Sequence, residues 1–164
     1  MNVSNNIKKF LYKNIDNSDI SRKEFCITAG IPYSTLSNLI HSISPNPDFI
    51  TIVKIANYFN CAVDQVVGRR KFLPSINLIV SFNNPDLNDI NSNLRNFLKA
   101  KLSQDNISPY LLSKNIGFSK TTIHCFLKAN SPYKMLSTNV ILALANYFNV
   151  SVDDMIGRYP TTKQ

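Results

Sequence analysis

Cysteine, histidine and enzyme motifs are all sparse in this sequence. Its three cysteines, Cys26, Cys61 and Cys125, lie far apart with no C-x-x-C pair, and His41 and His124 are its only histidines. This pattern supports neither a disulfide framework nor a zinc site. No G-x-S-x-G, H-E-x-x-H or P-loop motif occurs, and the ten carboxylates form no convincing catalytic pair. We therefore expect no enzyme, no cofactor, no metal and no small-molecule ligand.

Long apolar runs are missing as well. None approaches the roughly 18 residues that a membrane-spanning helix needs, and the N-terminal stretch has no apolar segment followed by a cleavage site. Hydrophobic residues make up 44% of the chain, which is enough for a packed core. These features predict a globular, cytoplasmic protein without a membrane partner.

Acidic residues are outnumbered. The chain has 18 Lys and Arg against 10 Asp and Glu, a net charge of +8 that favours a polyanionic partner such as nucleic acid. A division after Lys71 leaves nine basic and five acidic residues on each side, or +4 each, so the excess is not confined to a tail. The run Arg69-Arg70-Lys71 is interpreted as a solvated helix end, with phosphate binding as the alternative.

The chain contains an internal repeat. The string Ala-Asn-Tyr-Phe-Asn occurs at residues 56–60 and again at residues 145–149, a separation of 89. After this string, two further pairs match at the same separation: Val63-Asp64 with Val152-Asp153, and Gly68-Arg69 with Gly157-Arg158. Before the string, four pairs match at a separation of 87: Phe10-Leu11 with Phe97-Leu98, Ile20-Ser21 with Ile107-Ser108, Gly30 with Gly117, and Thr35 with Thr122. The pattern indicates a diverged tandem duplication.

Each copy is predicted to begin with an amphipathic helix. Its apolar residues recur at the i, i+3 and i+4 spacing of one helical face: Ile7, Phe10, Leu11 and Ile15, and then Leu94, Phe97, Leu98 and Leu102. A second helix follows, capped by Ser21 with Glu24 in a capping box in one copy, and by Ser108 with Pro109 at the first helical position in the other.

Three more helices are predicted in each copy. Gly30 and Gly117 end the second helix, because glycine adopts a positive φ without a Cβ penalty. The expected third helices cover Tyr33 to His41 and Lys120 to Lys128. Fourth helices capped by Asp48 and Ser137 end at the repeated Tyr-Phe-Asn, and short fifth helices cover Val63 to Val67 and Val152 to Ile156.

A connector from Phe72 to Asn91 separates the copies. It contains a β-branched apolar run, Ile76 to Phe82, bounded by proline and asparagine, which predicts a short β-strand. A lone strand leaves its backbone groups unpaired. It is expected either to pair with the same strand of a second chain, giving a homodimer, or to pack as a strap across both domains, and the dimer is slightly favoured.

Two short helices joined through a glycine turn form a helix-turn-helix. The motifs Ser21-Arg-Lys-Glu-Phe-Cys-Ile-Thr-Ala-Gly-Ile-Pro-Tyr-Ser-Thr-Leu-Ser-Asn-Leu39 and Ser108-Pro-Tyr-Leu-Leu-Ser-Lys-Asn-Ile-Gly-Phe-Ser-Lys-Thr-Thr-Ile-His-Cys-Phe126 resemble the Cro- and lambda-repressor-like (XRE-type) DNA-binding family. The resemblance covers residues 5–70 and 92–158. It implies an all-α protein of two tandem five-helix domains, at residues 1–71 and 92–164, with residues 72–91 as linker.

The resemblance also implies which residues contact DNA, since the third helix of this family enters the major groove. The base-reading positions are Tyr33, Ser34, Ser37 and Asn38 in the first copy, and Lys120, Thr121, His124 and Cys125 in the second. The phosphate-binding positions are Arg22 and Lys23 in the first copy, and Lys128 and Lys134 in the second. The second copy is the favoured reader, because its third helix carries the cations that the first lacks.

The predicted function is a sequence-specific transcriptional regulator that binds double-stranded DNA. The alternative is a protein-interaction module in which the helix-turn-helix scaffold no longer binds DNA specifically, since a fold does not determine its function.

Overall fold

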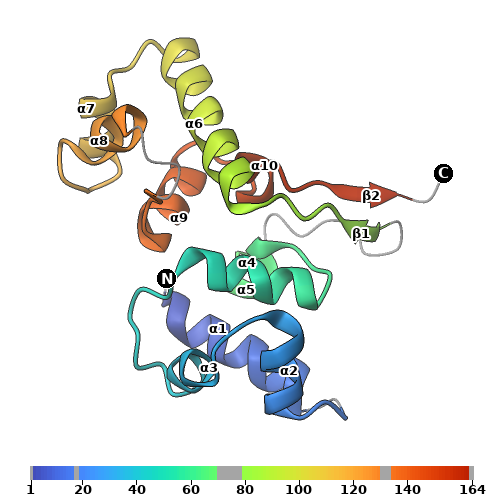
Figure 1. Cartoon of the computed structure of the whole chain (residues 1–164). Coiled ribbons are helices and arrows are strands. Elements are labelled where there is room, and N and C mark those ends of the chain that lie inside the picture. The colour runs from blue at the N-terminus through green and yellow to red at the C-terminus, as the bar shows by residue number, and fades with distance from the viewer. Residues whose placement is uncertain (1, 17–18, 70–78, 130–133, 163–164) are drawn as a thin grey trace. The chain divides into compact units, whose positions relative to one another are not determined.

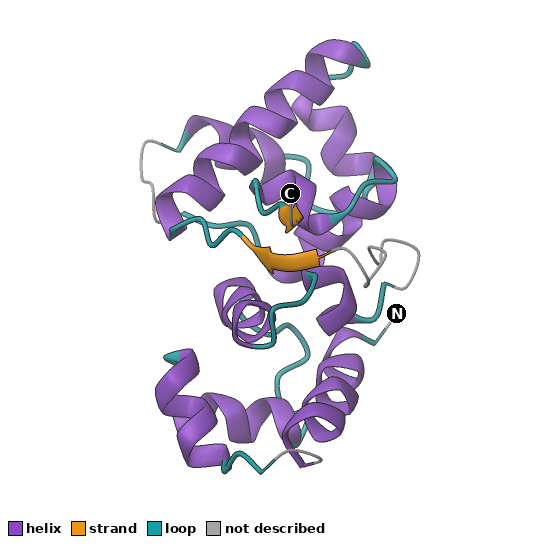
Figure 2. Ribbon diagram, turned by 90° about the vertical axis from the view of Figure 1, so that its right-hand side faces the viewer, coloured by secondary structure: helices purple, strands orange, loops and turns teal. Residues whose placement is uncertain are grey.

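The computed structural model describes residues 2–16, 19–69, 79–129 and 134–162 of the chain (Figure 1). The chain divides into two compact units: a first unit formed by Met1–Phe82 with Pro160–Gln164, and a second unit formed by Asn83–Tyr159. Helices dominate both units, and the described residues form one small sheet of two strands (Figure 2). No helix in these ranges combines the length and the apolar character needed to cross a membrane.

The described residues of the first unit form five α-helices and a π-helical turn. These are α1 (Val3–Leu11), the π-helix η1 (Tyr12–Asp16), α2 (Arg22–Ala29), α3 (Tyr33–Ile40), α4 (Phe49–Tyr58) and α5 (Val63–Val67). The second unit repeats the order with α6 (Leu87–Gln104), α7 (Pro109–Asn115), α8 (Thr122–Lys128), α9 (Thr138–Tyr147) and α10 (Val152–Ile156). The predicted all-α helix-turn-helix fold is confirmed.

Most of the predicted helix caps are present. The hydroxyl of Ser21 accepts a hydrogen bond from the amide of Glu24 at 3.2 Å, and the Asp48 carboxylate accepts one from Thr51 at 2.9 Å. Ser137 occupies the predicted cap position of α9 but makes no side-chain capping bond.

Two helix starts differ from the prediction. Helix α6 begins at Leu87, inside the segment expected as linker, because Asp86 caps it at 2.9 Å and Ile90 is buried one turn before Leu94. Helix α8 begins at Thr122 and leaves Lys120 in the preceding turn.

The later start of α8 has a local cause. The amide of Thr122 donates to the carbonyl of Ser119 at 2.9 Å, which closes a tight turn before the α-helical pattern begins. In the first unit the position of Ser119 is occupied by Pro32, whose φ of −58° is already close to a helical value, and α3 starts at the next residue.

The apolar stripes of the first helices are buried as predicted. Ile7, Leu11, Leu94 and Leu98 are inaccessible to solvent. The aromatic residue in each stripe packs edge to face against the phenylalanine of the repeated Tyr-Phe-Asn: the ring centroids are 5.4 Å apart for Phe10 and Phe59, and 5.6 Å for Phe97 and Phe148. The same contact therefore joins the first and fourth helices in both units.

The predicted strand is present, but its partner was not anticipated. Strand β1 (Ile79–Phe82) pairs antiparallel with β2 (Pro160–Thr162), near the C-terminal end of the same chain. The second unit is thus inserted in the chain between two paired strands of the first. Phe82 is buried, and its amide donates to the side chain of Asn60 at 2.9 Å. Residues 76–78 of the predicted strand lie outside the described residues, and the homodimer remains a prediction.

A buried ion pair follows the fifth helix in each unit. Arg69 pairs with Asp64, and Arg158 Nη1 lies 2.7 Å from Asp153 Oδ1. All four side chains are buried. The interpretation of Arg69 as part of a solvated helix end is therefore wrong, because the carboxylate five residues earlier neutralises it inside the core. Residues 70 and 71 of that run lie outside the described residues.

An asparagine and a glycine add to the ion pair that follows each fifth helix. We call the ion pair, the asparagine and the glycine together the buried closure. The Asn6 side-chain amide donates to the carbonyl of Val67 at 3.0 Å, and Asn93 makes the corresponding bond to Ile156 at 3.1 Å. The residue that follows each carbonyl is a glycine with φ of +81° or +71°, and a Cβ on the first of these would lie 2.6 Å from Asn6 Nδ2. Both the backbone conformation and the close approach therefore require glycine here.

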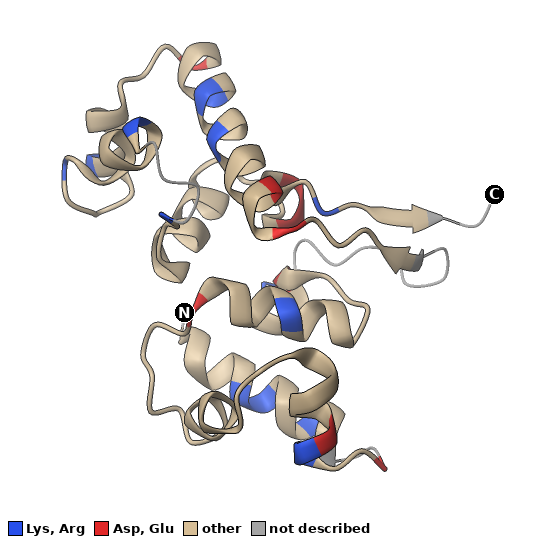
Figure 3. Cartoon of the chain, viewed as in Figure 1, with Lys and Arg blue, Asp and Glu red and all other residues tan. Residues whose placement is uncertain are grey.

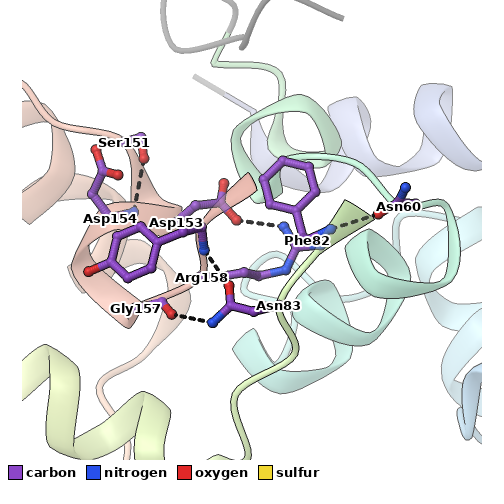
Figure 4. Close-up of polar contacts among 9 residues, drawn as sticks. Asn60, Phe82, Asn83, Ser151, Asp153, Asp154, Gly157 and Arg158 are labelled. Atoms are coloured by element: carbon purple, nitrogen blue, oxygen red, sulfur yellow. Dashed lines mark hydrogen bonds and ion pairs between the residues drawn. The ribbon is translucent and has the colours of Figure 1, made fainter. Parts of the chain in front are cut away.

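Figure 4 shows the closure in the second unit. The carboxylate of Asp153 faces Arg158, and the side chain of Asn83 spans the residues on either side of that arginine. Asn83 Nδ2 donates to the carbonyl of Gly157 at 2.9 Å, and its Oδ1 accepts from the amide of Tyr159. The segment that leaves α10 is held by backbone and side-chain hydrogen bonds together.

Arg158→Met should destabilise the second unit by about 3 to 5 kcal/mol, because it leaves the Asp153 carboxylate buried without its counter-ion. Urea unfolding of the full chain, followed by circular dichroism, measures the loss. The unpaired carboxyl would have a raised folded-state pKa, so the deficit should shrink as the pH falls towards 4. The exposed neighbour provides the control: Asp154→Asn should cost less than about 1 kcal/mol. Equal stability of Arg158→Met and the parent chain would contradict a stabilising role of the pair.

Candidate nucleic-acid interface

The helix-turn-helix of the second unit consists of α7, a glycine turn and α8. The hydroxyl of Ser108 caps α7 by accepting from the amide of Leu111 at 3.2 Å. After α7, Gly117 adopts a φ of +78°, and the amide of Phe118 donates back to the carbonyl of Ser113 at 3.0 Å. The first unit closes its turn in the same way, with Gly30 at +62°. The predicted turn glycines are confirmed.

Ser113 connects the two helices of this motif. Its buried hydroxyl donates to the carbonyl of Pro109 at 2.8 Å and accepts from the amide of Ile123 at 3.2 Å. That amide belongs to the first turn of α8, where backbone donors lack intrahelical acceptors, and the cap residue Thr121 makes no side-chain capping bond. Ser113 therefore caps α8 from the neighbouring helix. No pattern in the sequence predicts this bond.

The first unit has Cys26 at the equivalent position. The residue is buried, and burial raises the pKa of its thiol above the usual value. A thiol is a weaker hydrogen-bond partner than a hydroxyl. The two units thus share the small side chain needed at this helix crossing but differ in its polarity.

The other end of α8 is held by Arg95 on α6. Its Nε donates to the carbonyl of Phe126 at 3.3 Å, and its guanidinium carbon lies 4.7 Å from the centroid of the Phe126 ring. A cation near the C-terminal carbonyls of a helix is favourable, and its stacking on the ring adds a cation–π contact. Arg95 is half-buried, so it acts as an anchor of α8.

The predicted base-reading residues of the second unit are brought together on one exposed surface. Thr121, His124 and Cys125 are exposed at the start and along the outer face of α8. Lys120 is exposed in the turn before α8, and its ammonium lies 5.5 Å from the ring centroid of Tyr110. The predicted phosphate-binding lysines are exposed as well: Lys128 ends α8 and Lys134 lies beyond it.

Most of the corresponding residues of the first unit are exposed as well. Tyr33, Ser34 and Asn38 are exposed on α3, and Ser37 is half-buried. The two predicted phosphate-binding residues start α2. Lys23 is exposed, whereas Arg22 is half-buried with its guanidinium carbon 5.9 Å from the centroid of the Tyr12 ring.

The two helix-turn-helix surfaces differ most at two equivalent positions. The first unit exposes Ile27 by 73% and Tyr33 by 59%, whereas the second unit has Lys114 and Lys120 there, both exposed. The first surface is thus apolar where the second is cationic.

Charge is unevenly distributed within the second unit. Figure 3 shows a group of acidic residues at α10 and at the start of α6, a further acidic residue at the other end of α6, and lysines and arginines along α6 and around α8. Four of its aspartates belong to the acidic group: Asp86, Asp89, Asp153 and Asp154. Exposed lysines attract a polyanion, so the α8 side is the more favourable one for nucleic acid. Among the described residues, no cluster of His, Cys, Asp and Glu has three members that could hold a metal ion.

Comparison with known proteins agrees with this geometry. The model of the Cro/C1-type helix-turn-helix DNA-binding domain matches residues 95–161, which include α7 and α8. An HTH-type transcriptional regulator of Rickettsia prowazekii is 36% identical over 73 residues, which are 43% of this chain and 79% of the relative. A second such regulator, from Rickettsia conorii, is also 36% identical over 73 residues, which are 67% of its length. No solved structure matches. The chain belongs to the Cro/C1-type helix-turn-helix family.

Ser113→Ala should destabilise the second unit by about 1 to 3 kcal/mol, because the buried amide of Ile123 loses its acceptor. Urea unfolding measures the effect. Ser103 lies exposed on α6, so Ser103→Ala serves as the matched control and should change stability by less than about 0.5 kcal/mol. If both alanine variants unfold alike, Ser113 contributes to α8 only through its small size.

Proposed function

We propose that this protein is a sequence-specific transcriptional regulator whose second unit reads the major groove of double-stranded DNA. The observation that carries the proposal is the exposed cationic surface around α8, within the segment that matches the Cro/C1-type domain. Recognition helices of this class place their N-terminal residues against base edges.

The roles within the second unit follow from position and chemistry. Lys120 donates to guanine acceptors, and Thr121, His124 and Cys125 line the same base-facing surface. Lys128 and Lys134 bind phosphates flanking the groove, where a cation releases condensed counter-ions.

The first unit is proposed to be a weaker reader of the same family. The repeat and the common order of five helices support this assignment. It would engage an adjacent half-site through Tyr33, Ser34, Ser37 and Asn38, with Arg22 and Lys23 on the phosphates. Such a tandem protein would recognise two related but unequal half-sites about one helical turn, roughly 34 Å, apart.

One observation favours a second role for the first unit. Its helix-turn-helix surface exposes Ile27, Tyr33 and Ile43, the last by 66%, and carries no lysine or arginine on the outer face of α3. An apolar surface of this kind suits a protein partner better than a phosphate backbone. In this alternative the first unit is an interaction module and the footprint on DNA covers one half-site.

DNA binding should weaken steeply with salt. Four phosphate contacts give a slope of about −3.6 in log K against log salt, which is a loss on the order of 10²-fold between 50 and 200 mM. Fluorescence anisotropy with fragments selected from random DNA by the full chain measures the slope. Arg22→Ala should make it shallower by about one unit if the first unit contacts phosphate. Salt-independent binding, or no binding at low salt, would favour the interaction module for both units.

Lys120→Ala should reduce base discrimination by about 1 to 3 kcal/mol, whereas Asn38→Ala should reduce it less, because Asn38 has no neighbouring cation on its helix. Competition between selected and random duplexes gives the discrimination of each variant. Both residues are exposed, and circular dichroism should show unchanged folding. Loss of operator binding in Asn38→Ala alone would assign the reading to the first unit.

A further inference from the structure

Tyr110 lies beside the proposed base-reading lysine. It is the second residue of α7, half of its surface is exposed, and the Lys120 ammonium lies 5.5 Å from its ring centroid. This is within the distance over which a cation is attracted to the face of an aromatic ring. The two residues come from opposite sides of the glycine turn and meet on the exposed surface of the motif.

We infer that Tyr110 is a positioning residue for Lys120, and that its ring aims the ammonium at the base edges. The inference rests on the proposed function, in which Lys120 contacts DNA. It assigns a role to a residue that is neither on α8 nor a predicted phosphate-binding residue.

The position of Lys120 explains why such support is needed. Because α8 begins at Thr122, the helix does not set the direction of the Lys120 side chain. A lysine has a long flexible stem, and immobilising it on DNA costs conformational entropy. An aromatic ring that already holds the ammonium reduces this cost before DNA arrives.

The helix that carries the ring is well anchored. Leu112 and Ser113, two and three residues after Tyr110, are buried, and Ser113 is hydrogen-bonded to both α7 and α8. The backbone of Tyr110 is therefore held in the framework of the motif.

The first unit has the same two residue types in exchanged order. At the positions of Tyr110 and Lys120 it carries Lys23 and Tyr33, both exposed. Lys23 thus lies at the start of the second helix, at a position expected to face phosphate. Tyr33 lies at the position expected to face the bases. A lysine supported at the base-facing position is specific to the second unit.

The contact can be tested first without DNA. Protons next to the Lys120 ammonium should show an upfield ring-current shift in the nuclear magnetic resonance spectrum of the full chain. Tyr110→Leu should abolish the shift and Tyr110→Phe should keep it, because the phenyl ring retains the cation–π contact. Absence of the shift in the parent chain would overturn the inference.

Affinity measurements then connect the contact to recognition. Tyr110→Leu should weaken binding to the selected duplex about two- to fivefold, with no loss for Tyr110→Phe. In a Lys120→Ala background, Tyr110→Leu should have no further effect. A loss in Tyr110→Phe would show that the hydroxyl binds DNA directly, and an undiminished effect in the Lys120→Ala background would show that Tyr110 acts independently. Either result would overturn the inference.

An exchange variant separates this inference from the proposed function. The double substitution Tyr110→Lys with Lys120→Tyr gives the second unit the order of the first and keeps its net charge. It should retain the salt dependence of the parent chain but lose its preference for the selected duplex. Unchanged preference would overturn the positioning role while leaving DNA binding intact, whereas a parent chain that binds no DNA would instead remove the proposed function.

Discussion

The buried closure behind the fifth helix is the constraint on which the rest of the second unit depends. Asp153 neutralises Arg158 inside the core, and Asn93 binds the last carbonyl of α10 in the space that Gly157 leaves open. Together these contacts hold α10 against α6. Helix α6 in turn carries Arg95, which reaches the C-terminal turn of α8. The placement of α8 thus depends on a salt bridge that is buried in the core of the unit.

Helix α8 is positioned at both ends by polar groups that lie behind its exposed surface. Ser113 accepts from the amide of Ile123 near the start of the helix, and Arg95 donates to Phe126 near its end. Apolar packing alone is non-directional, whereas these hydrogen bonds limit rotation and sliding of the helix. The contacts that position the helix thus lie on the side opposite to its exposed residues Thr121, His124 and Cys125.

The repeat made most of the fold predictable, since two copies of each cap, glycine and apolar stripe support one another. Three of the features that could not be predicted from the sequence have clear physical reasons. Strand β2 is three residues long and shows no alternating pattern, and its pairing spans 80 residues between Ser81 and Thr161. The later start of α8 depends on one backbone hydrogen bond, from the amide of Thr122 to the carbonyl of Ser119, which residue types do not reveal. The burial of Arg69 depends on a carboxylate five residues away, which local charge patterns do not reveal.

The two copies keep the residues of the buried closure and differ in polarity on the surface of the helix-turn-helix. Replacing one member of a buried ion pair costs about 3 to 5 kcal/mol, a large part of the stability of a small domain, whereas an exposed replacement usually costs less than about 0.5. The Asp, Gly and Arg of the closure are accordingly identical in both units, while Ile27 and Tyr33 stand where the second unit has Lys114 and Lys120. The same order of five helices therefore carries an apolar surface in one unit and a cationic surface in the other.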